Sequence, residues 1–353
     1  MAIPPARRAL DDIPVYRAGK AAASEDHKLS SNENPFGPLP GVMERAAVEL
    51  GRINRYPDAG VTDLYAALSA RFDLPADHFA AGTGSVAVLF SLLHAHCEDG
   101  DEVVYAWRSF EAYPIAVDLT GAVGVRVPLR ADATHDLDAM AGAITDRTRV
   151  VIVCTPNNPT GPMVPAADLV AFLDAVPPAV LVVVDEAYVE FVRADGAASG
   201  LDVLATHDNV VVLRTFSKAY GLAGLRVGYA IARPPVAEAI RKATPPFSVT
   251  DVAQAAAVAS LESQDELDRR VESIVQERTR MRAVLRSQGF EVPEAEGNFV
   301  WLPLGDDALA FAAACDPVSV RPFAGEGVRI SVGAATANTR FLEAAAAWQT
   351  SHS

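Results

Sequence analysis

The sequence predicts an α/β protein with a large three-layer domain, built on a mostly parallel sheet, and a smaller α+β domain. Between residues 81 and 231, apolar runs rich in β-branched residues alternate with helical stretches, which is typical of parallel strands joined by helices. After Pro245 and Pro246 this alternation gives way to one long helical stretch and several short strands. The chain has 353 residues, 50% of them hydrophobic, which is enough for two cores.

Charge and cysteine usage narrow the class of protein. The 45 acidic and 30 basic residues give a net charge of −15, which argues against nucleic acid or an anionic membrane as partner. Cys97, Cys154 and Cys315 are scattered without a Cys-x-x-Cys spacing, so they predict reduced thiols and neither a disulfide frame nor a metal site. No apolar run approaches the ~18 residues of a membrane span, and no signal peptide is recognisable. We therefore expect a cytoplasmic protein.

Three regions are expected along the chain. Residues 1–44 are rich in Pro, Ala and Gly and predict an arm that packs with the small domain, whereas 45–245 form the large domain and 246–353 the small one. The active site should lie in the cleft between the two domains. Helices are expected at 42–51, 86–93, 138–145, 252–288 with a kink near 263, and 339–348, and strands at 102–105, 123–128, 150–154, 180–184, 210–213, 225–231, 290–292, 298–302 and 328–332.

One lysine, Lys218, lies in a glycine-punctuated loop between the strands expected at 210–213 and 225–231. A lysine beside a serine is usually a solvated surface residue. At the mouth of a buried sheet, however, desolvation lowers the pKa of an amine and makes it nucleophilic, as a Schiff-base enzyme requires. Lys218 is therefore a candidate catalytic residue, and the neighbouring motifs decide between the two interpretations.

Three other loops carry polar candidates. Asp185 ends an apolar strand at the edge where open α/β sheets bind ligands, and it can pair with a protonated ring nitrogen or simply serve as a turn residue. Tyr188 can hydrogen-bond a ligand or lie in the core. Asn158 belongs to a turn that its prolines and glycine explain without any function. Gly84 and Ser85 precede an apolar helix, whose N-terminal N–H groups favour an anion.

The lysine loop resembles that of class I and II aminotransferases. It has the pattern Ser-Lys-x-x-Gly-x-x-Gly-x-Arg, and the Asn-Pro-x-Gly turn and the strand-ending acid precede it in the family order. The resemblance implies PLP fold type I, with pyridoxal 5'-phosphate (PLP) carried by Lys218. It also implies ring-nitrogen pairing by Asp185 and hydrogen bonds to the phenolic oxygen from Asn158 and Tyr188. Phe110 is expected to stack on the ring, with a place in the core as the alternative. The residues expected to bind the phosphate are Gly84, Ser85, Ser217 and Arg226.

Other segments resemble the histidinol-phosphate aminotransferase branch of this family. Residues 13–20 and 31–37 look like its N-terminal elements, which implies substrate-binding roles for Tyr16 and Asn34. An Arg-x-Ser-x-Gly element implies that Arg329 clamps a substrate carboxylate with a fork matched to two oxygens, and Arg321 could add a second cation. In the family, the tyrosine at the position of Tyr56 reaches the cofactor phosphate of the neighbouring subunit, which implies a homodimer.

The substrate prediction depends on two departures from the histidinol-phosphate pattern. Val86 and Ala87 follow Ser85, where that branch commonly has a small residue and an Asp-Glu pair, and residues 107–114 look more like aromatic amino-acid aminotransferases of the actinobacterial type. We therefore predict ping-pong transfer of an amino group between Phe, Tyr or Trp and a 2-oxo acid such as 2-oxoglutarate. Histidinol phosphate is the alternative amino donor. A PLP decarboxylase of the threonine-phosphate type and a non-catalytic binding protein are alternatives of other classes.

Overall fold

The computed structural model describes residues 6, 10, 13 and 27–352 of the chain, so Tyr16 lies outside the described residues. Within this part of the chain the strands form a seven-stranded sheet, in the order β1-β7-β6-β5-β4-β2-β3, and a three-stranded sheet, in the order β8-β10-β9. The strands are β1 (Phe79–Gly82), β2 (Glu102–Trp107), β3 (Val123–Pro128), β4 (Thr148–Cys154), β5 (Leu181–Asp185), β6 (Val210–Thr215), β7 (Gly228–Ala232), β8 (Phe299–Gly305), β9 (Arg321–Phe323) and β10 (Glu326–Ser331).

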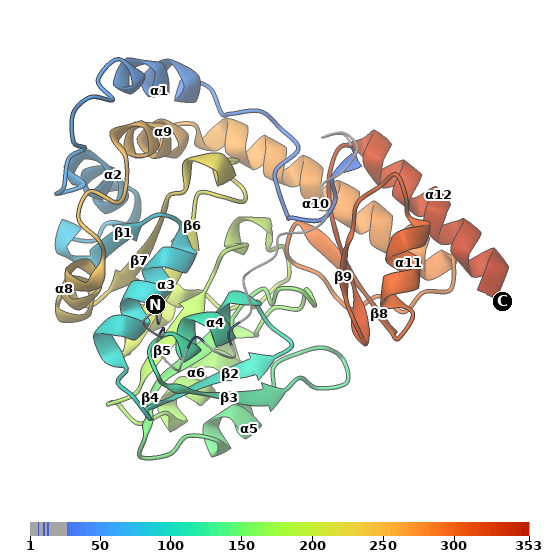
Figure 1. Cartoon of the computed structure of the whole chain (residues 1–353), viewed down its shortest axis with the longest axis horizontal. Helices are drawn as coiled ribbons and strands as arrows, with labels where there is room; N and C mark the ends of the chain where they lie inside the picture. The colour runs from blue at the N-terminus through green and yellow to red at the C-terminus, as the bar shows by residue number, and fades with distance from the viewer. Residues whose placement is uncertain (1–5, 7–9, 11–12, 14–26, 353) are drawn as a thin grey trace, which may run out of the picture.

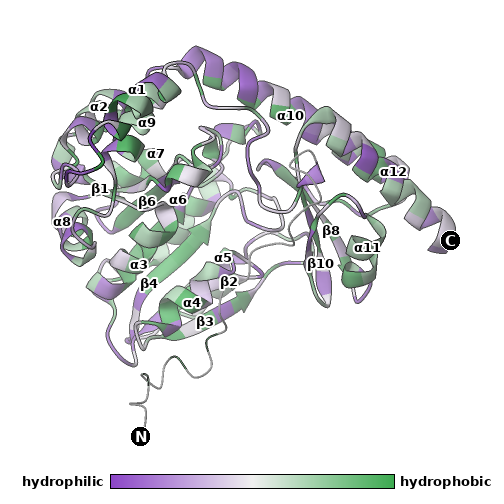
Figure 2. Ribbon diagram, turned by 45° about the horizontal axis from the view of Figure 1, so that its top comes forward, coloured by the Kyte–Doolittle hydropathy of each residue, from purple (hydrophilic) through white to green (hydrophobic). Residues whose placement is uncertain are grey.

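The large sheet is mostly parallel, as predicted. Strands β3, β2, β4, β5 and β6 pair in parallel, whereas β7 runs antiparallel to both of its neighbours, β6 and β1. Successive residues of the central strands face opposite cores: Val182 and Val184 belong to one hydrophobic cluster and Val183 to the other. Because both faces are buried, these strands are continuous apolar runs, and β4 is strongly hydrophobic in Figure 2.

Helices cover both faces of this sheet and complete the three layers. Helices α3, α4 and α8 contribute side chains to the cluster around Val183, and α2, α5, α6, α7 and α9 contribute to the other. The helices are α1 (Val42–Leu50), α2 (Thr62–Phe72), α3 (Ser85–His96), α4 (Ala112–Asp118), α5 (Leu137–Gly142), α6 (Ala166–Ala175), α7 (Gly200–Leu204), α8 (Pro234–Ala243), α9 (Asp251–Leu261), α10 (Gln264–Ser287), α11 (Ala308–Ala314) and α12 (Ala335–His352). None of those in the described range has the length and apolar character needed to cross a membrane.

The 24-residue helix α10 leads from the large domain to the small one (Figure 1). The sequence predicts one long helix with a kink near Ser263. The structure has two helices there, because α9 ends at Leu261 and α10 begins at Gln264. The predicted domain boundary at residue 245 lies just before α9. Helix α9 packs against α1 and α2. Helices α10 and α11 pack against the small sheet, and α12 packs against these two helices.

The strand expected at 290–292 is absent, and this prediction was wrong. The backbone there closes the end of α10 instead: the Phe290 N–H donates to the carbonyl of Leu285 at 3.1 Å, after Gly289 with φ of 91°. The Val292 carbonyl accepts a hydrogen bond from Arg286 at 2.7 Å. Phe290 and Val292 are both buried, so their apolar character reflects core packing next to a helix terminus and not strand pairing.

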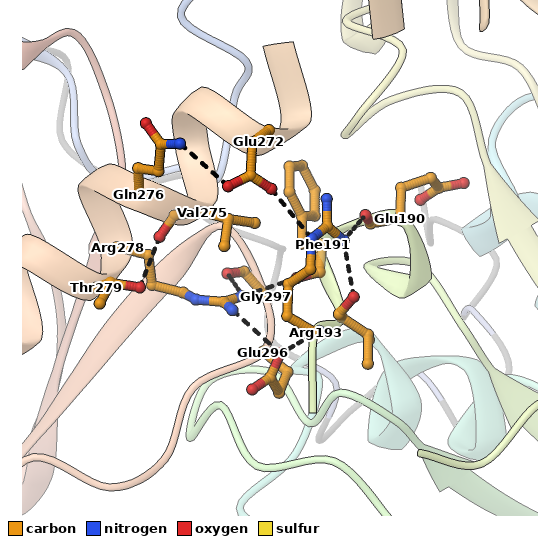
Figure 3. Close-up of polar contacts among 11 residues, drawn as sticks. Glu190, Phe191, Arg193, Glu272, Val275, Gln276, Arg278, Thr279, Glu296 and Gly297 are labelled. Carbon is orange, nitrogen blue, oxygen red and sulfur yellow. Dashed lines mark hydrogen bonds and ion pairs between the residues drawn. The ribbon is translucent and has the colours of Figure 1, made fainter. Parts of the chain in front are cut away.

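A buried polar junction joins the two domains (Figure 3). Arg278 of α10 donates to the backbone carbonyls of Phe191 and Gly297, both at 3.0 Å, and pairs with Glu296 at 3.1 Å. The same carboxylate oxygen of Glu296 accepts the Arg193 N–H at 2.8 Å. The junction therefore fixes α10 against the segment that follows Tyr188 in the large domain.

Candidate active site

The candidate site lies at the carboxyl edge of the large sheet, between the two domains. Cys154 of β4, Asp185 of β5 and Leu213 of β6 are neighbours in register, so the loops that follow these strands meet there. They open onto a cavity of about 420 Å³, a size typical of small-molecule sites. The predicted site residues that line it are Ser85, Phe110, Asn158, Asp185, Tyr188, Ser217, Lys218, Arg226, Arg321 and Arg329.

Lys218 is held inside this cavity. Its Nζ donates to the backbone carbonyl of Ser31 at 3.3 Å and lies 5.7 Å from the centre of the Tyr188 ring. Desolvation, reinforced by the positive charge of Arg329, lowers the pKa of the amine to about 7. A substantial fraction of the amine is therefore neutral near physiological pH, and a neutral amine can act as a nucleophile or accept a proton.

Asp185 is the last residue of β5, lines the cavity and has one carboxylate oxygen without a hydrogen-bond partner among the described residues. Its Oδ2 accepts a hydrogen bond from the Tyr113 hydroxyl at 2.7 Å, whereas its buried Oδ1 receives none from any described residue. Burial raises the pKa of the carboxyl to about 6, and the Tyr113 hydrogen bond opposes that rise. Such an oxygen requires a donor, and the protonated nitrogen of a pyridine ring meets that requirement.

The predicted phosphate-binding residues form a compact cationic cradle. Helix α3 begins at Ser85, and the Arg226 Nη1 donates to Ser217 Oγ at 3.3 Å beside it. Gly84 has φ of 88°, and a Cβ there would lie 2.5 Å from Arg226 Nη2. A Cβ on Gly228 would lie 2.3 Å from the Ser85 nitrogen. The missing side chains let the helix N-terminus and the guanidinium converge, which suits a phosphate dianion.

Tyr188 and Asn158 face the cavity between Asp185 and the small domain. The Tyr188 hydroxyl accepts a hydrogen bond from Asn32 Nδ2 at 3.0 Å, and its ring packs edge-on against Phe299 at 5.0 Å. Asn158 Oδ1 accepts a hydrogen bond from Arg329 Nη1 at 2.6 Å. Because the Tyr188 hydroxyl oxygen and Asn158 Oδ1 both accept hydrogen bonds, the hydroxyl proton of Tyr188 and the amide N–H groups of Asn158 can donate to a ligand oxygen.

Two arginines reach the cavity from the small domain. Arg329 of β10 is 8% exposed, and besides Asn158 it contacts the carbonyl of Ser30 at 2.8 Å. Arg321 of β9 is its cross-strand neighbour, and its Nη2 contacts both carboxylate oxygens of Glu111 at 3.0 Å. A fork of N–H donors at Arg329 suits a substrate carboxylate, and Arg321 is engaged by a carboxylate of the protein itself.

Residues 28–34, termed the strap, cross the site. The Leu29 N–H donates to the carbonyl of Ser319 at 2.8 Å, and the Asn32 N–H donates to Ser331 Oγ at 2.7 Å. At the far end, Asn34 Nδ2 donates to the carbonyl of Ala219 at 2.7 Å. Asn34 does not line the cavity, although it was predicted to bind substrate, and in this structure it anchors the lysine loop.

Phe110 and Tyr56 differ in their placement. Phe110 lines the cavity and packs edge-on against Tyr113 with ring centres 5.7 Å apart. Tyr56 is 82% exposed, does not line the cavity of its own chain, and packs against Phe247 at 4.8 Å.

Sequence reasoning assigned no site role to Tyr113, Asn32 or Glu111. A signal for Tyr113 exists, because it lies within residues 107–114, the same family-like segment that contains Phe110. Asn32 lies within residues 31–37, the segment that resembles the family, but the resemblance implies a role for Asn34 and not for Asn32. No sequence pattern around Glu111 indicates a site role, because that role comes from its contact with Arg321 on β9 of the other domain.

A lysine loop at the carboxyl edge of a sheet with this strand order places the chain in PLP fold type I. Residues 24–347 match the family of class I and II aminotransferases, and the chain belongs to that family. An aromatic amino acid aminotransferase of Streptomyces coelicolor is 57% identical over 345 residues, which cover 96% of each chain. Its namesake in Thermobifida fusca is 55% identical, again over 96% of each. The crystal structure of histidinol-phosphate aminotransferase from Sinorhizobium meliloti in complex with PLP has a TM-score of 0.89 and 28% identity, and covers 100% of this chain and 99% of that one.

Proposed function

We propose that this chain is a PLP-dependent aminotransferase that moves the amino group of Phe, Tyr or Trp to a 2-oxo acid such as 2-oxoglutarate. The observation that best supports this proposal is that Lys218 and Asp185 line one cavity beside the cationic phosphate-binding residues. Lys218 has a lowered pKa, and Asp185 has a buried oxygen without a hydrogen-bond partner among the described residues. The family assignment supports the reaction type. The two relatives that are named aromatic amino acid aminotransferases support an aromatic amino acid as the amino donor.

The residues present fit PLP. Ser85, Ser217 and Arg226 would hold the phosphate, Lys218 would carry the aldehyde carbon, and Asp185 Oδ1 would accept the ring N–H. Asn158 and Tyr188 would donate to the phenolic oxygen, and Phe110 would cover the ring. When bound, PLP supplies an electron sink that stabilises negative charge at the substrate α-carbon.

The chain's own residues would then position the substrate and move one proton. Arg329 holds the α-carboxylate, which places the α-hydrogen near the amine of Lys218. The neutral amine of Lys218 would accept the α-proton of the substrate at Nζ and later return it, and bound PLP would supply the electron sink for this proton transfer. Asp185 stays ionised against the protonated ring nitrogen.

A homodimer in which Tyr56 reaches the neighbouring cavity belongs to the same proposal. Large apolar side chains are unusually exposed in residues 43–56 and at Phe247, with Ile53 74% and Met43 62% exposed. Surface apolar clusters of this kind mark protein interfaces. Cytoplasmic location is proposed as well, and three buried free thiols support it.

Histidinol phosphate is the second candidate donor, supported by the likeness to histidinol-phosphate aminotransferases of known structure. Arg329 suits a carboxylate or a phosphate and does not discriminate between them. The test is a half-reaction: PLP-loaded protein receives Phe, Tyr, Trp or histidinol phosphate separately, and loss of the PLP absorbance band is followed. Faster conversion by the aromatic amino acids supports the proposal. The reverse order overturns the substrate assignment, and release of carbon dioxide would indicate a decarboxylase.

A further inference from the structure

Two guanidinium groups enter the cavity from adjacent strands. Arg329 of β10 and Arg321 of β9 are directly opposite in register, and both line the cavity. Residues directly opposite in an antiparallel pair project from the same face with Cβ atoms ~5 Å apart. The small domain therefore places two potential carboxylate-binding groups side by side.

An adjacent pair of arginines would suit an acidic amino acid. Each guanidinium can bind one carboxylate in a fork, and glutamate and aspartate carry a second carboxylate a few bonds from the first. If Arg329 binds the α-carboxylate, Arg321 is placed to bind the carboxylate of the side chain. These two residues alone would therefore favour a dicarboxylic substrate over an aromatic one.

Glu111 changes this arrangement. It lies directly before α4 in the large domain, and both of its carboxylate oxygens lie 3.0 Å from Arg321 Nη2. The side chain of Arg321 is 15% exposed and that of Glu111 29%, so the pair is largely removed from water and its attraction is weakly screened. A carboxylate of the protein thus occupies the place that a substrate side-chain carboxylate would take.

The cavity wall near Glu111 is apolar. Val86 and Phe90 of α3, Phe110, and Ile115 of α4 all line it. An aromatic side chain gains free energy by burial against such a surface, whereas a carboxylate loses its hydration there.

We propose that Glu111 is a specificity-determining residue: by neutralising Arg321, it selects amino donors with an apolar side chain and disfavours donors with a second carboxylate. This inference rests on the proposed aminotransferase function. An acidic acceptor such as 2-oxoglutarate then competes with Glu111 for Arg321, so Glu111 also raises the KM for that acceptor.

A second ion pair supplies a matched control. Arg108, in the loop that carries Phe110, pairs with Glu326 at the start of β10 and lies 5.3 Å from the centre of the Phe323 ring. This pair also joins the large domain to the small sheet, but neither member lines the substrate cavity. Glu326→Gln therefore weakens a similar interdomain contact without changing the charge that a substrate meets.

The experiment compares PLP-loaded wild type, Glu111→Gln and Glu326→Gln. Half-reaction kcat/KM values are measured for Phe and for glutamate, and KM is measured for 2-oxoglutarate and phenylpyruvate. Glu111→Gln should shift the Glu-to-Phe ratio toward glutamate on the order of tenfold and should lower KM for 2-oxoglutarate only. Glu326→Gln should leave the ratio unchanged. Calorimetric titration with glutarate and 3-phenylpropionate should show a selective gain for glutarate in Glu111→Gln.

Each outcome has one meaning. An unchanged ratio and unchanged glutarate affinity in Glu111→Gln, or the same shift in Glu326→Gln, overturns the specificity role and leaves a purely interdomain contact. If wild type converts none of the amino acids, the proposed function fails instead, whereas the glutarate titration still reports on Glu111.

Discussion

The lowered pKa of Lys218 makes the stability of the cofactor-free protein depend on pH. The amine has a pKa of about 7 in the folded chain against an ordinary value of 10.5. Between these values the unfolded chain binds a proton that the folded chain does not, so the free energy of unfolding rises with pH across this window. Below pH 7 both states are charged, and the full cost of burying the ammonium group is present. Lys218→Met should remove this dependence.

The magnitude follows from the size of the shift. A full pH unit inside the window adds about 1.36 kcal/mol, and the folded-state amine is half-titrated at pH 7, so moving from pH 7 to pH 9 would stabilise wild type by ~2.3 kcal/mol relative to Lys218→Met. Lys218 is only half-buried, because it lines an open cavity, and water therefore screens part of this cost. We expect a difference of roughly 1–2 kcal/mol.

Urea unfolding of the cofactor-free proteins at both pH values measures this difference. The control is Lys242→Met, since that side chain is 73% exposed on α8 and its removal should leave the pH dependence of wild type intact. Parallel pH dependence in wild type and Lys218→Met would refute the reasoning, because the amine would then have the same pKa in the folded and unfolded chains. Lys218→Met should also abolish transamination.

Three further predictions concern the surroundings of the site. Gly84→Ala should weaken PLP binding at least tenfold in equilibrium dialysis, since its Cβ would displace Arg226, which lies 2.5 Å away. Tyr113→Phe removes a hydrogen bond from the ionised Asp185 and should raise its pKa, about 6 in wild type, by roughly one unit; the loss of PLP affinity on acidification should then begin about one pH unit higher. Arg278→Met should destabilise the protein by ~3 kcal/mol in urea unfolding, and adding Glu296→Gln should recover part of this loss, because the single change leaves a buried carboxylate uncompensated.

The central residues of the site could be predicted because the fold brings sequence motifs together in a simple way. Asp185 ends an apolar strand, Asn158 and Lys218 each follow one, and parallel strands bring their carboxyl ends to one edge. Once the strands are recognised, the loops after them must meet. The roles of these residues toward PLP stay predictions until the cofactor is bound and the variants are measured.

Contacts between distant segments could not be predicted in this way. Asn32 bonds Tyr188 across 156 positions, and no local pattern shows that Asn32 contacts Tyr188 while Asn34 contacts the lysine loop. Strand β9 has three residues and contains Pro322, which argues against a strand when read alone. It forms because β10 pairs with it, and its position then fixes the contact between Arg321 and Glu111.

The strap has a consequence for the order in which the protein is made. It lies near the start of the chain, yet its partners include Ser319 and Ser331, and Asn32 and Ser331 are 299 positions apart. The ribosome delivers the strap first and these partners almost last, whereas the large domain can begin to fold during synthesis. Completion of the cavity must therefore wait until the C-terminal sheet has left the ribosome, and closing so long a loop is a slow step. A nascent chain arrested before residue 319 would present the lysine loop and the strap without the contacts to Ser319 and Ser331.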